Sequence, residues 1–527
     1  MEKLATALRG PTAMMRRLPL FFATVLITAT TLVAAGEPVA PTSQPLLNPP
    51  PAGSDLPDMG SPAQEMLSQS DEYRLGAMVA RQLRDENALI EDPEISEYIN
   101  GVGWRLAAQS AEGGRHFQYF VIKDPEINSF AVPGGYVFIN EGLVLATTSE
   151  SELASVMAHE TAHVTQHHIA RAIRAQSQQS LTTAAALIAA ILLGAMGGGQ
   201  AVEGGIAAAE GLAVQQQINF TRDNEMEADR VGIGFLAGAG FDPNAMATFF
   251  DTMSRHEGLA TTYIPAMLID HPVTTDRIAE ARARAAQFPA PKTVDSQSYE
   301  LIRERVRVLT ATGDVDMAQQ YVTRLAQDSG DRLSNHYGEA LALMSGSHPD
   351  EAVKILTPLV QQHQGLTLLY CALGQAQARA GHMADALGTF RHAESLFPRN
   401  VPVTVRYAET LMAAGRPLEA HNMLLDLFNN VPPTPEQIRL TANAASAAGD
   451  AGDAYFYMGE YQIAGGELNL AVQQLQLALA TPHLSIIQQQ RYQARLDEVR
   501  DYLATTRKRQ LASDNGGGDQ GQRGGGR

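Results

Sequence analysis

The chain has 527 residues, a formal net charge of −18, 45% hydrophobic residues and 18% charged residues. A chain of this length contains about two to four domains, and so few charged residues exclude a mostly disordered polyelectrolyte. Acidic residues outnumber basic ones by 57 to 39, which argues against a nucleic-acid binder. The single cysteine, Cys371, excludes an intrachain disulfide and a multi-thiolate metal site.

Four basic residues near the N-terminus precede an apolar run from Leu18 to Ala35 that ends in small residues. This pattern predicts a secretory signal peptide over residues 1–36, and the alternative is an uncleaved anchor helix. Residues 37–69 are rich in proline and are predicted to be an extended linker. Residues 512–527 are mostly Gly, Asp, Gln and Arg, and we expect a disordered tail there.

The first motif with a chemical meaning is His159-Glu160-Thr161-Ala162-His163. Two histidines four residues apart face the same side of a helix, so both imidazoles can bind one zinc ion. Glu160 then lies beside a metal-bound water and can act as general base. Ser149 and Glu152 predict a capping box at the start of this helix. The alternative is an ordinary amphipathic helix with two surface histidines.

The third zinc ligand decides the subclass of peptidase. A metzincin would carry Gly and His where this chain has Gln166 and Ile169. The first dense acidic cluster is residues 225–230, in which Glu225 and Asp229 share one helix face. One of the two can bind zinc while the other holds a ligand imidazole in the right tautomer. A solvated acidic helix face is the alternative.

Together these motifs resemble the metallopeptidase family of the CAAX prenyl endopeptidases and the bacterial membrane heat-shock proteases. Two more blocks match that family, residues 128–136 and His271-Pro272 with Arg277. The resemblance implies a zincin-like metallopeptidase domain over residues 70–295, helical with a small β-sheet, and one zinc ion per subunit. It also implies that Glu225 is the third zinc ligand and that Asp229 is a catalytic proton donor or a residue that orients a ligand.

In the resembled family the His-Pro block lies close to the active site. A catalytic zinc ion keeps an open fourth position for water, and we expect the neutral imidazole of His271 to occupy it as a plug. Arg277 can stabilise the oxyanion once this segment moves. The alternative is that His271 only packs or forms hydrogen bonds near the site.

Two segments of the predicted peptidase domain suit a role beside the zinc ion. Pro133-Gly134-Gly135 separates two short apolar runs and predicts a hairpin. Its edge strand can hold an extended peptide substrate, or the hairpin belongs only to the core. Residues 175–202 contain no charged side chain. Their apolar part, 181–199, is predicted to be a lid over the cleft, a segment that touches the membrane or a membrane span.

From residue 300 a small residue recurs every 34 positions, and an alanine follows each one by five positions. The small residues are Gly313, Ser347, Gly381, Gly415 and Gly449, and the alanines are Ala318, Ala352, Ala386, Ala420 and Ala454. This period predicts an α-solenoid of tetratricopeptide repeats over residues 300–508, so the whole chain is mainly α. After Gly449 the phase jumps by 17 residues, to Gly466 and Ala471. The array either binds a partner on its concave surface or serves as a structural cap.

A secreted zinc peptidase joined to tetratricopeptide repeats resembles the periplasmic quality-control proteases of Gram-negative bacteria. The resemblance implies a zinc-dependent endopeptidase of the periplasm that degrades, or helps to assemble, outer-membrane proteins. Its repeats would bind the barrel-assembly machinery or its clients. A peripheral membrane contact through residues 181–199 stays one of the alternatives to a lid for that segment. The alternative is a latent protease that acts mainly as a repeat-based chaperone or scaffold.

Overall fold

The computed structural model describes residues 69–111, 117–171, 222–259, 267, 271–289, 291, 295–311, 316–327 and 332–516. The predicted signal peptide, residues 37–68 of the predicted linker and the apolar segment 181–199 lie outside these ranges. Within the described ranges, no helix combines the length and the apolar character that crossing a membrane requires.

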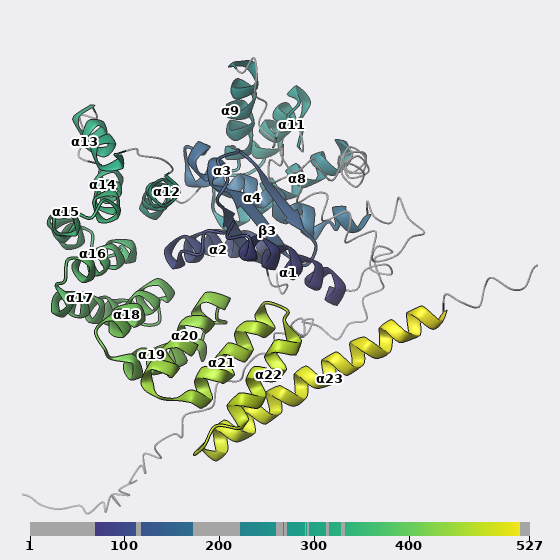
Figure 1. Cartoon of the computed structure of the whole chain (residues 1–527). Helices are drawn as coiled ribbons and strands as arrows, with labels where there is room; N and C mark the ends of the chain where they lie inside the picture. The colour runs from purple at the N-terminus through teal and green to yellow at the C-terminus, as the bar shows by residue number, and fades with distance from the viewer. Residues whose placement is uncertain are drawn as a thin grey trace, which may run out of the picture. The chain divides into compact units, whose positions relative to one another are not determined.

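A three-stranded sheet supports the N-terminal part of the described chain (Figure 1). Its strands are β1 (Gln118–Ile122), β2 (Ser129–Val132) and β3 (Tyr136–Asn140), in the order β1-β3-β2. β1 pairs in parallel with β3, whereas β2 pairs antiparallel with β3. The predicted hairpin is therefore confirmed, and β2 lies at an edge of this sheet. Gly134 and Gly135 make the turn with φ angles of 88° and 89°, which favour glycine.

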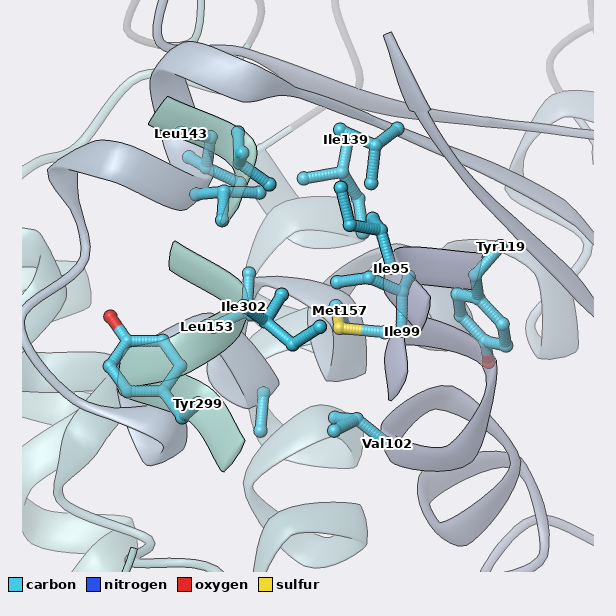
Figure 2. Packing of buried hydrophobic residues seen from close by; sticks show 14 of the residues in the cluster. Ile95, Ile99, Val102, Tyr119, Ile139, Leu143, Leu153, Met157, Tyr299 and Ile302 are labelled. Atoms are coloured by element: carbon cyan, nitrogen blue, oxygen red, sulfur yellow. The ribbon is translucent and has the colours of Figure 1, made fainter. Parts of the chain in front are cut away.

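Helices pack around the sheet: α1 (Gln69–Asp85), α2 (Pro93–Ala107), α3 (Glu141–Ala146), α4 (Glu150–Thr165), α8 (Arg222–Ala239), α9 (Ala245–Leu259) and α11 (Thr275–Ala285). The core between them includes Ile95 and Ile99 of α2, Ile139 of β3 and Met157 of α4 (Figure 2). Ile302 belongs to the same buried cluster and comes from the first repeat helix, α12 (Gln297–Leu309). The repeats therefore share a core with the sheet-containing part.

Helix α4, which carries the His-Glu-x-x-His motif, is buried along all of its 16 residues. It is therefore enclosed on every side, rather than being the amphipathic helix with surface histidines that was the alternative. Ser149 is its N-cap, and its hydroxyl accepts from the Glu152 backbone N–H. The predicted capping box is wrong in its second half, because the Glu152 carboxylate accepts from the backbone N–H and the hydroxyl of Thr148 instead.

The C-terminal part is a series of helices (Figure 1). After α12 come α13 (Met317–Gln327), α14 (Leu333–Ser345), α15 (Pro349–Gln362), α16 (Thr367–Arg379), α17 (Met383–Leu396), α18 (Val401–Ala413), α19 (Pro417–Phe428), α20 (Pro435–Ala448), α21 (Ala451–Ala464), α22 (Leu468–Leu479) and α23 (Ile486–Gly516). From α13 onward each helix packs against the next in the sequence, whereas α12 packs against α14. α23 extends into residues 512–516, the beginning of the segment predicted to be disordered.

The 34-residue period matches the turns between paired helices. Ser347, Gly381, Gly415 and Gly449 all have φ angles between 66° and 86°, the left-handed conformation that ends a helix. Ala352, Ala386 and Ala420 are fully buried where the helices touch. The repeat prediction is thus confirmed, although Gly313 lies outside the described residues.

The predicted change of phase after Gly449 also has a structural counterpart. A single helix, α21, separates Gly449 from Gly466, which again has a left-handed φ of 74°. α21 packs against both α20 and α22. A step of 17 residues therefore adds one helix to the array, where a step of 34 adds two.

Candidate metal centre

Three separate segments of the chain bring four donor side chains together. His159 and His163 lie on α4, Glu225 lies on α8, and His271 precedes α11. All four side chains are buried, and each offers one ligand atom within 4.8 Å of the others. The structure therefore joins residues that are up to 112 positions apart in the sequence.

The distances between these donor atoms fit a small tetrahedral cation. His159 Nε2 lies 2.9 Å from His163 Nε2 and 3.3 Å from His271 Nδ1. Glu225 Oε1 lies 3.5 Å from His163 Nε2 and 3.2 Å from His271 Nδ1. Ligands that are ~2.0–2.2 Å from a tetrahedral zinc ion are roughly 3.3–3.6 Å apart, so three imidazoles and one carboxylate suit that ion.

The buried donors shift one another's pKa values in different directions. Burial, together with the neighbouring imidazoles of His159 and His271, holds the pKa of His163 well below its ordinary value. Burial favours a protonated Glu225, but the imidazoles of His271 and His159 outweigh it and hold the pKa of that carboxyl well below its usual range. At neutral pH His163 is therefore a neutral imidazole and Glu225 an ionised carboxylate, the forms that bind a metal. At His159 burial is outweighed by hydrogen bonds to the Asp229 and Glu225 carboxylates, which raise its pKa to about 10, so this imidazole has to release a proton when a cation binds.

The two acidic residues that share a face of α8 have different surroundings. Glu225 faces the donor atoms, whereas Asp229 Oδ1 lies 3.0 Å from the outer nitrogen, Nδ1, of His159. Arg277 donates to both oxygens of Asp229, over 2.7 and 2.8 Å. These hydrogen bonds, from Arg277 and then from His159, hold the pKa of Asp229 below its ordinary value against the opposing effect of burial.

Arg277 also reaches past Asp229. Its Nη1 atom lies 2.9 Å from Glu225 Oε2 and donates to the Pro272 carbonyl over 2.8 Å. The guanidinium is thus bound to two acids of α8 and to the backbone of the His-Pro block. To stabilise an oxyanion, Arg277 would have to leave at least one of these partners.

Glu160 lies between the sheet and His271. Its Oε1 atom accepts a hydrogen bond of 2.7 Å from the hydroxyl of Ser129, the first residue of the edge strand β2. The same oxygen is 3.7 Å from His271 Nε2. The carboxylate is therefore held beside the donor cluster and beside the strand that is expected to hold substrate.

Two residues next to the cluster have no role assigned to them from the sequence. His168 follows α4 and contacts His163, and Glu227 on α8 contacts His168. The sequence gives little indication that His168 contacts His163, because the two are five positions apart and residues at that spacing do not share a helix face.

Comparison with known proteins identifies the family. The profile of Peptidase family M48 matches residues 93–285. A putative beta-barrel assembly-enhancing protease of Vibrio cholerae is 35% identical over 450 residues, which are 84% of this chain and 92% of that protein. The chain belongs to the beta-barrel assembly-enhancing protease family. The member from Escherichia coli is 33% identical, over 84% of this chain and 91% of its own.

Membership of this protease family makes the chain a metalloendopeptidase. A shorter match, 32% identical over 34% of this chain and 50% of the relative, is the mitochondrial metalloendopeptidase OMA1 of Schizosaccharomyces pombe. Among solved structures, a thermophilic TPR protein of Thermus thermophilus covers 38% of this chain and 94% of its own at 18% identity, with a TM-score of 0.23. The repeat assignment rests on the helices and turns described above.

Proposed function

We propose that the chain is a zinc-dependent endopeptidase in which His159, His163 and Glu225 bind the metal. The observation that carries this proposal is the buried cluster of donor atoms, all within 4.8 Å of one another, beside the Glu160 carboxylate. A zinc ion bound there would polarise the scissile carbonyl and make a bound water acidic near neutral pH.

The roles of the surrounding residues follow from their contacts. Glu160 takes the proton of the attacking water as general base, and the Ser129 hydroxyl orients its carboxylate. Asp229 accepts from Nδ1–H of His159 and so keeps the Nε2 lone pair of that imidazole directed at the metal. Because, despite burial, Arg277 and His159 hold its pKa low, Asp229 is an ionised acceptor, and this proposal gives it the orienting role rather than that of a proton donor.

In this proposal His271 is the plug, a side chain that occupies the fourth coordination position of the zinc ion in place of water. Its Nδ1 atom faces the same space as the other donors, 3.2 Å from Glu225. When His271 and Pro272 move away, the Arg277 guanidinium loses its bond to the Pro272 carbonyl and becomes available to an oxyanion.

The substrate of the proposed enzyme is an extended protein segment. β2 is an edge strand whose first residue contacts Glu160, so a peptide that pairs with this edge passes the general base. The relatives are named for beta-barrel assembly, and this supports outer-membrane proteins as substrates and the barrel-assembly machinery as partner of the repeats. The acidic composition argues against a nucleic-acid partner.

The location follows from the sequence. An N-terminal signal peptide over residues 1–36 would export the chain to the periplasm. Residues 181–199 would there form either a lid over the active-site cleft or a peripheral contact with membrane. The peptidase domain would span residues 70–295 and the repeat domain residues 300–508. Within Peptidase family M48, the motif blocks would be similar to those of the CAAX prenyl and membrane heat-shock proteases.

The purified mature chain provides the test. We expect one zinc ion per chain, and casein cleavage that a chelator stops and added zinc restores. His163→Ala should lose zinc, because a site with few protein ligands loses a large share of its affinity with each one. His348→Ala is the matched control, since that side chain is 62% exposed. Full zinc retention by His163→Ala would contradict the ligand assignment.

A further inference from the structure

His168 is completely buried and lies directly behind the candidate ligand His163. Its Nδ1 atom is 2.8 Å from His163 Nδ1, and its Nε2 atom is 3.1 Å from Glu227 Oε2. The rings of His163 and His168 meet edge to face at an interplanar angle of 80°. Both nitrogens of His168 therefore lie within hydrogen-bond distance of a partner, although the side chain is outside the donor cluster itself.

The backbone takes an unfavourable conformation to place this ring. α4 ends at Thr165, and His167 then adopts a left-handed φ of 52°, which is costly for a residue with a Cβ. Residues 168–171 are helical again after this turn. A straight continuation of α4 would carry position 168 to another face of the helix, away from His163. Local strain of this kind is retained where it holds a functional group in place.

The contacts continue beyond His168 to the helix that carries the third candidate ligand. Arg171 donates to Glu227 Oε2 over 2.9 Å and to Asn224 Oδ1 over 2.8 Å. Asn224 and Glu227 lie on either side of Glu225 on α8. The short segment 168–171 therefore ties the end of α4 to the first turns of α8.

The donor and acceptor roles in these hydrogen bonds follow from the position of His163 in the metal-donor cluster. Nε2 of His163 faces the other ligand atoms, so the proton of its neutral ring belongs on Nδ1. That N–H donates to Nδ1 of His168, whose own proton is then on Nε2 and donates to the Glu227 carboxylate. Every hydrogen bond in this series has one donor and one acceptor.

We propose that His168 is a positioning residue that fixes the tautomer and the ring orientation of His163, with Glu227 and Arg171 behind it. The proposal rests on the zinc site argued above. It gives each histidine of the His-Glu-x-x-His motif its own outer partner, Asp229 for His159 and His168 for His163. Loss of such an outer partner weakens metal binding by roughly 10–100-fold.

The test measures the zinc affinity of the full mature chain by competition with a chromophoric chelator. His168→Leu and His168→Gln have side chains of similar size, but only glutamine can both accept from His163 and donate to Glu227. We expect leucine to weaken zinc binding roughly 10–100-fold and glutamine to retain most of the affinity. Equal affinities for the two variants, whether both high or both low, would overturn the proposal.

A second variant, at Glu227, tests the outer end of this hydrogen-bond series and creates no cavity in the core. The Glu227 side chain is 36% exposed, and Glu227→Ala should weaken zinc binding by a smaller factor, roughly 3–10-fold. Wild-type affinity in Glu227→Ala would contradict the extended network. A different result would contradict the proposed zinc site itself. In that case the wild-type chain and the His348→Ala control would also fail to bind one zinc ion per chain.

Discussion

At the scale of single residues, His271 is the side chain whose removal should raise activity. It shares the donor space with three candidate ligands, and its other nitrogen is 3.7 Å from Glu160. His271→Ala should therefore free the position of the attacking water and increase casein cleavage while zinc remains bound. A gain of roughly tenfold corresponds to a fourth position that is open about 10% of the time in the wild type.

The control for this variant is again His348→Ala, which should cleave at the wild-type rate. Zinc content has to be measured on each sample, since His271 is also a candidate ligand. Unchanged or lower activity at normal zinc content would show that His271 positions substrate or packs against the site, and the plug would be wrong.

The sequence predicts those residues of the site whose arrangement depends only on one helix. His159 and His163 share a helix face whatever the rest of the chain does, so their spacing is informative. The roles of Glu225 and Asp229 depend on how α8 lies against α4, which no local pattern specifies. His168 requires the left-handed turn at His167, and nothing in its residue type predicts that turn.

At the scale of elements, the hairpin turn at Gly134 is more sensitive than the repeat turns. A Cβ on Gly134 would lie 2.6 Å from the Glu72 carbonyl and from the Tyr73 backbone, and φ there is +88°. Gly381 has a similar φ of +81° but no atom within 4 Å of the added Cβ. Alanine should cost about 1–2 kcal/mol at Gly381, from backbone strain alone.

At Gly134 the same change should cost more, about 2–5 kcal/mol, because the clash with α1 is added to the strain. Urea unfolding of the two variants against wild type measures the difference. Gly134→Ala should also slow casein cleavage, because the turn positions β2 and hence the contact from Ser129 to Glu160. Equal destabilisation by the two substitutions would refute the role given to close packing at this turn.

The elements themselves could be predicted to different extents. The repeat period is visible because each left-handed turn demands a small residue at a fixed step, as at Gly415 and Gly449. The complete burial of α4 could not be predicted from the sequence, because the helix contains several Glu, Ser and His residues, which are usually solvent-exposed. Only the surrounding helices and sheet, together with hydrogen bonds such as that from Ser129, make those polar faces compatible with burial.

At the scale of the whole molecule, a buried ion cluster joins α2 to the repeats. Asp92, the N-cap of α2, accepts two hydrogen bonds of 2.7 Å from Arg305 on α12. Arg406 on α18 donates to Asp92 over 2.8 Å and to Glu94 over 2.7 Å. Despite burial, these arginines hold the pKa of Asp92 well below its usual range. The cluster links one peptidase helix to repeat helices about a hundred positions apart.

Glu97 lies beside this cluster and makes the link sensitive to pH. Burial, with a further contribution from the Glu94 charge, raises the pKa of Glu97 from 4.5 to about 7, and Asn400 of the repeats donates to it over 2.9 Å. Between pH 4.5 and 7 the folded protein therefore binds a proton that the unfolded chain has released. Stability falls as pH rises through that window, and the loss is complete above pH 7.

Glu97→Gln should remove this loss while keeping the hydrogen bond from Asn400. The variant is expected to match wild type near pH 4.5 and to be more stable by about 2 kcal/mol at pH 8, after allowance for partial exposure of the carboxyl. Urea unfolding at the two pH values measures the difference, and Glu351→Gln on an exposed helix face controls for the lost negative charge. A stability difference that does not change with pH would refute the assignment.

The central claim is that the buried cluster is the site of zinc-dependent peptide hydrolysis and that Glu160 is its base. Casein cleavage by Glu160→Gln, with zinc measured on the same sample, tests this most directly. Glutamine keeps the shape of the side chain and the bond from Ser129 but cannot take a proton. We predict one zinc ion per chain and cleavage reduced by roughly 10²–10⁴-fold. A zinc-loaded Glu160→Gln variant that cleaves at nearly the wild-type rate would contradict the account.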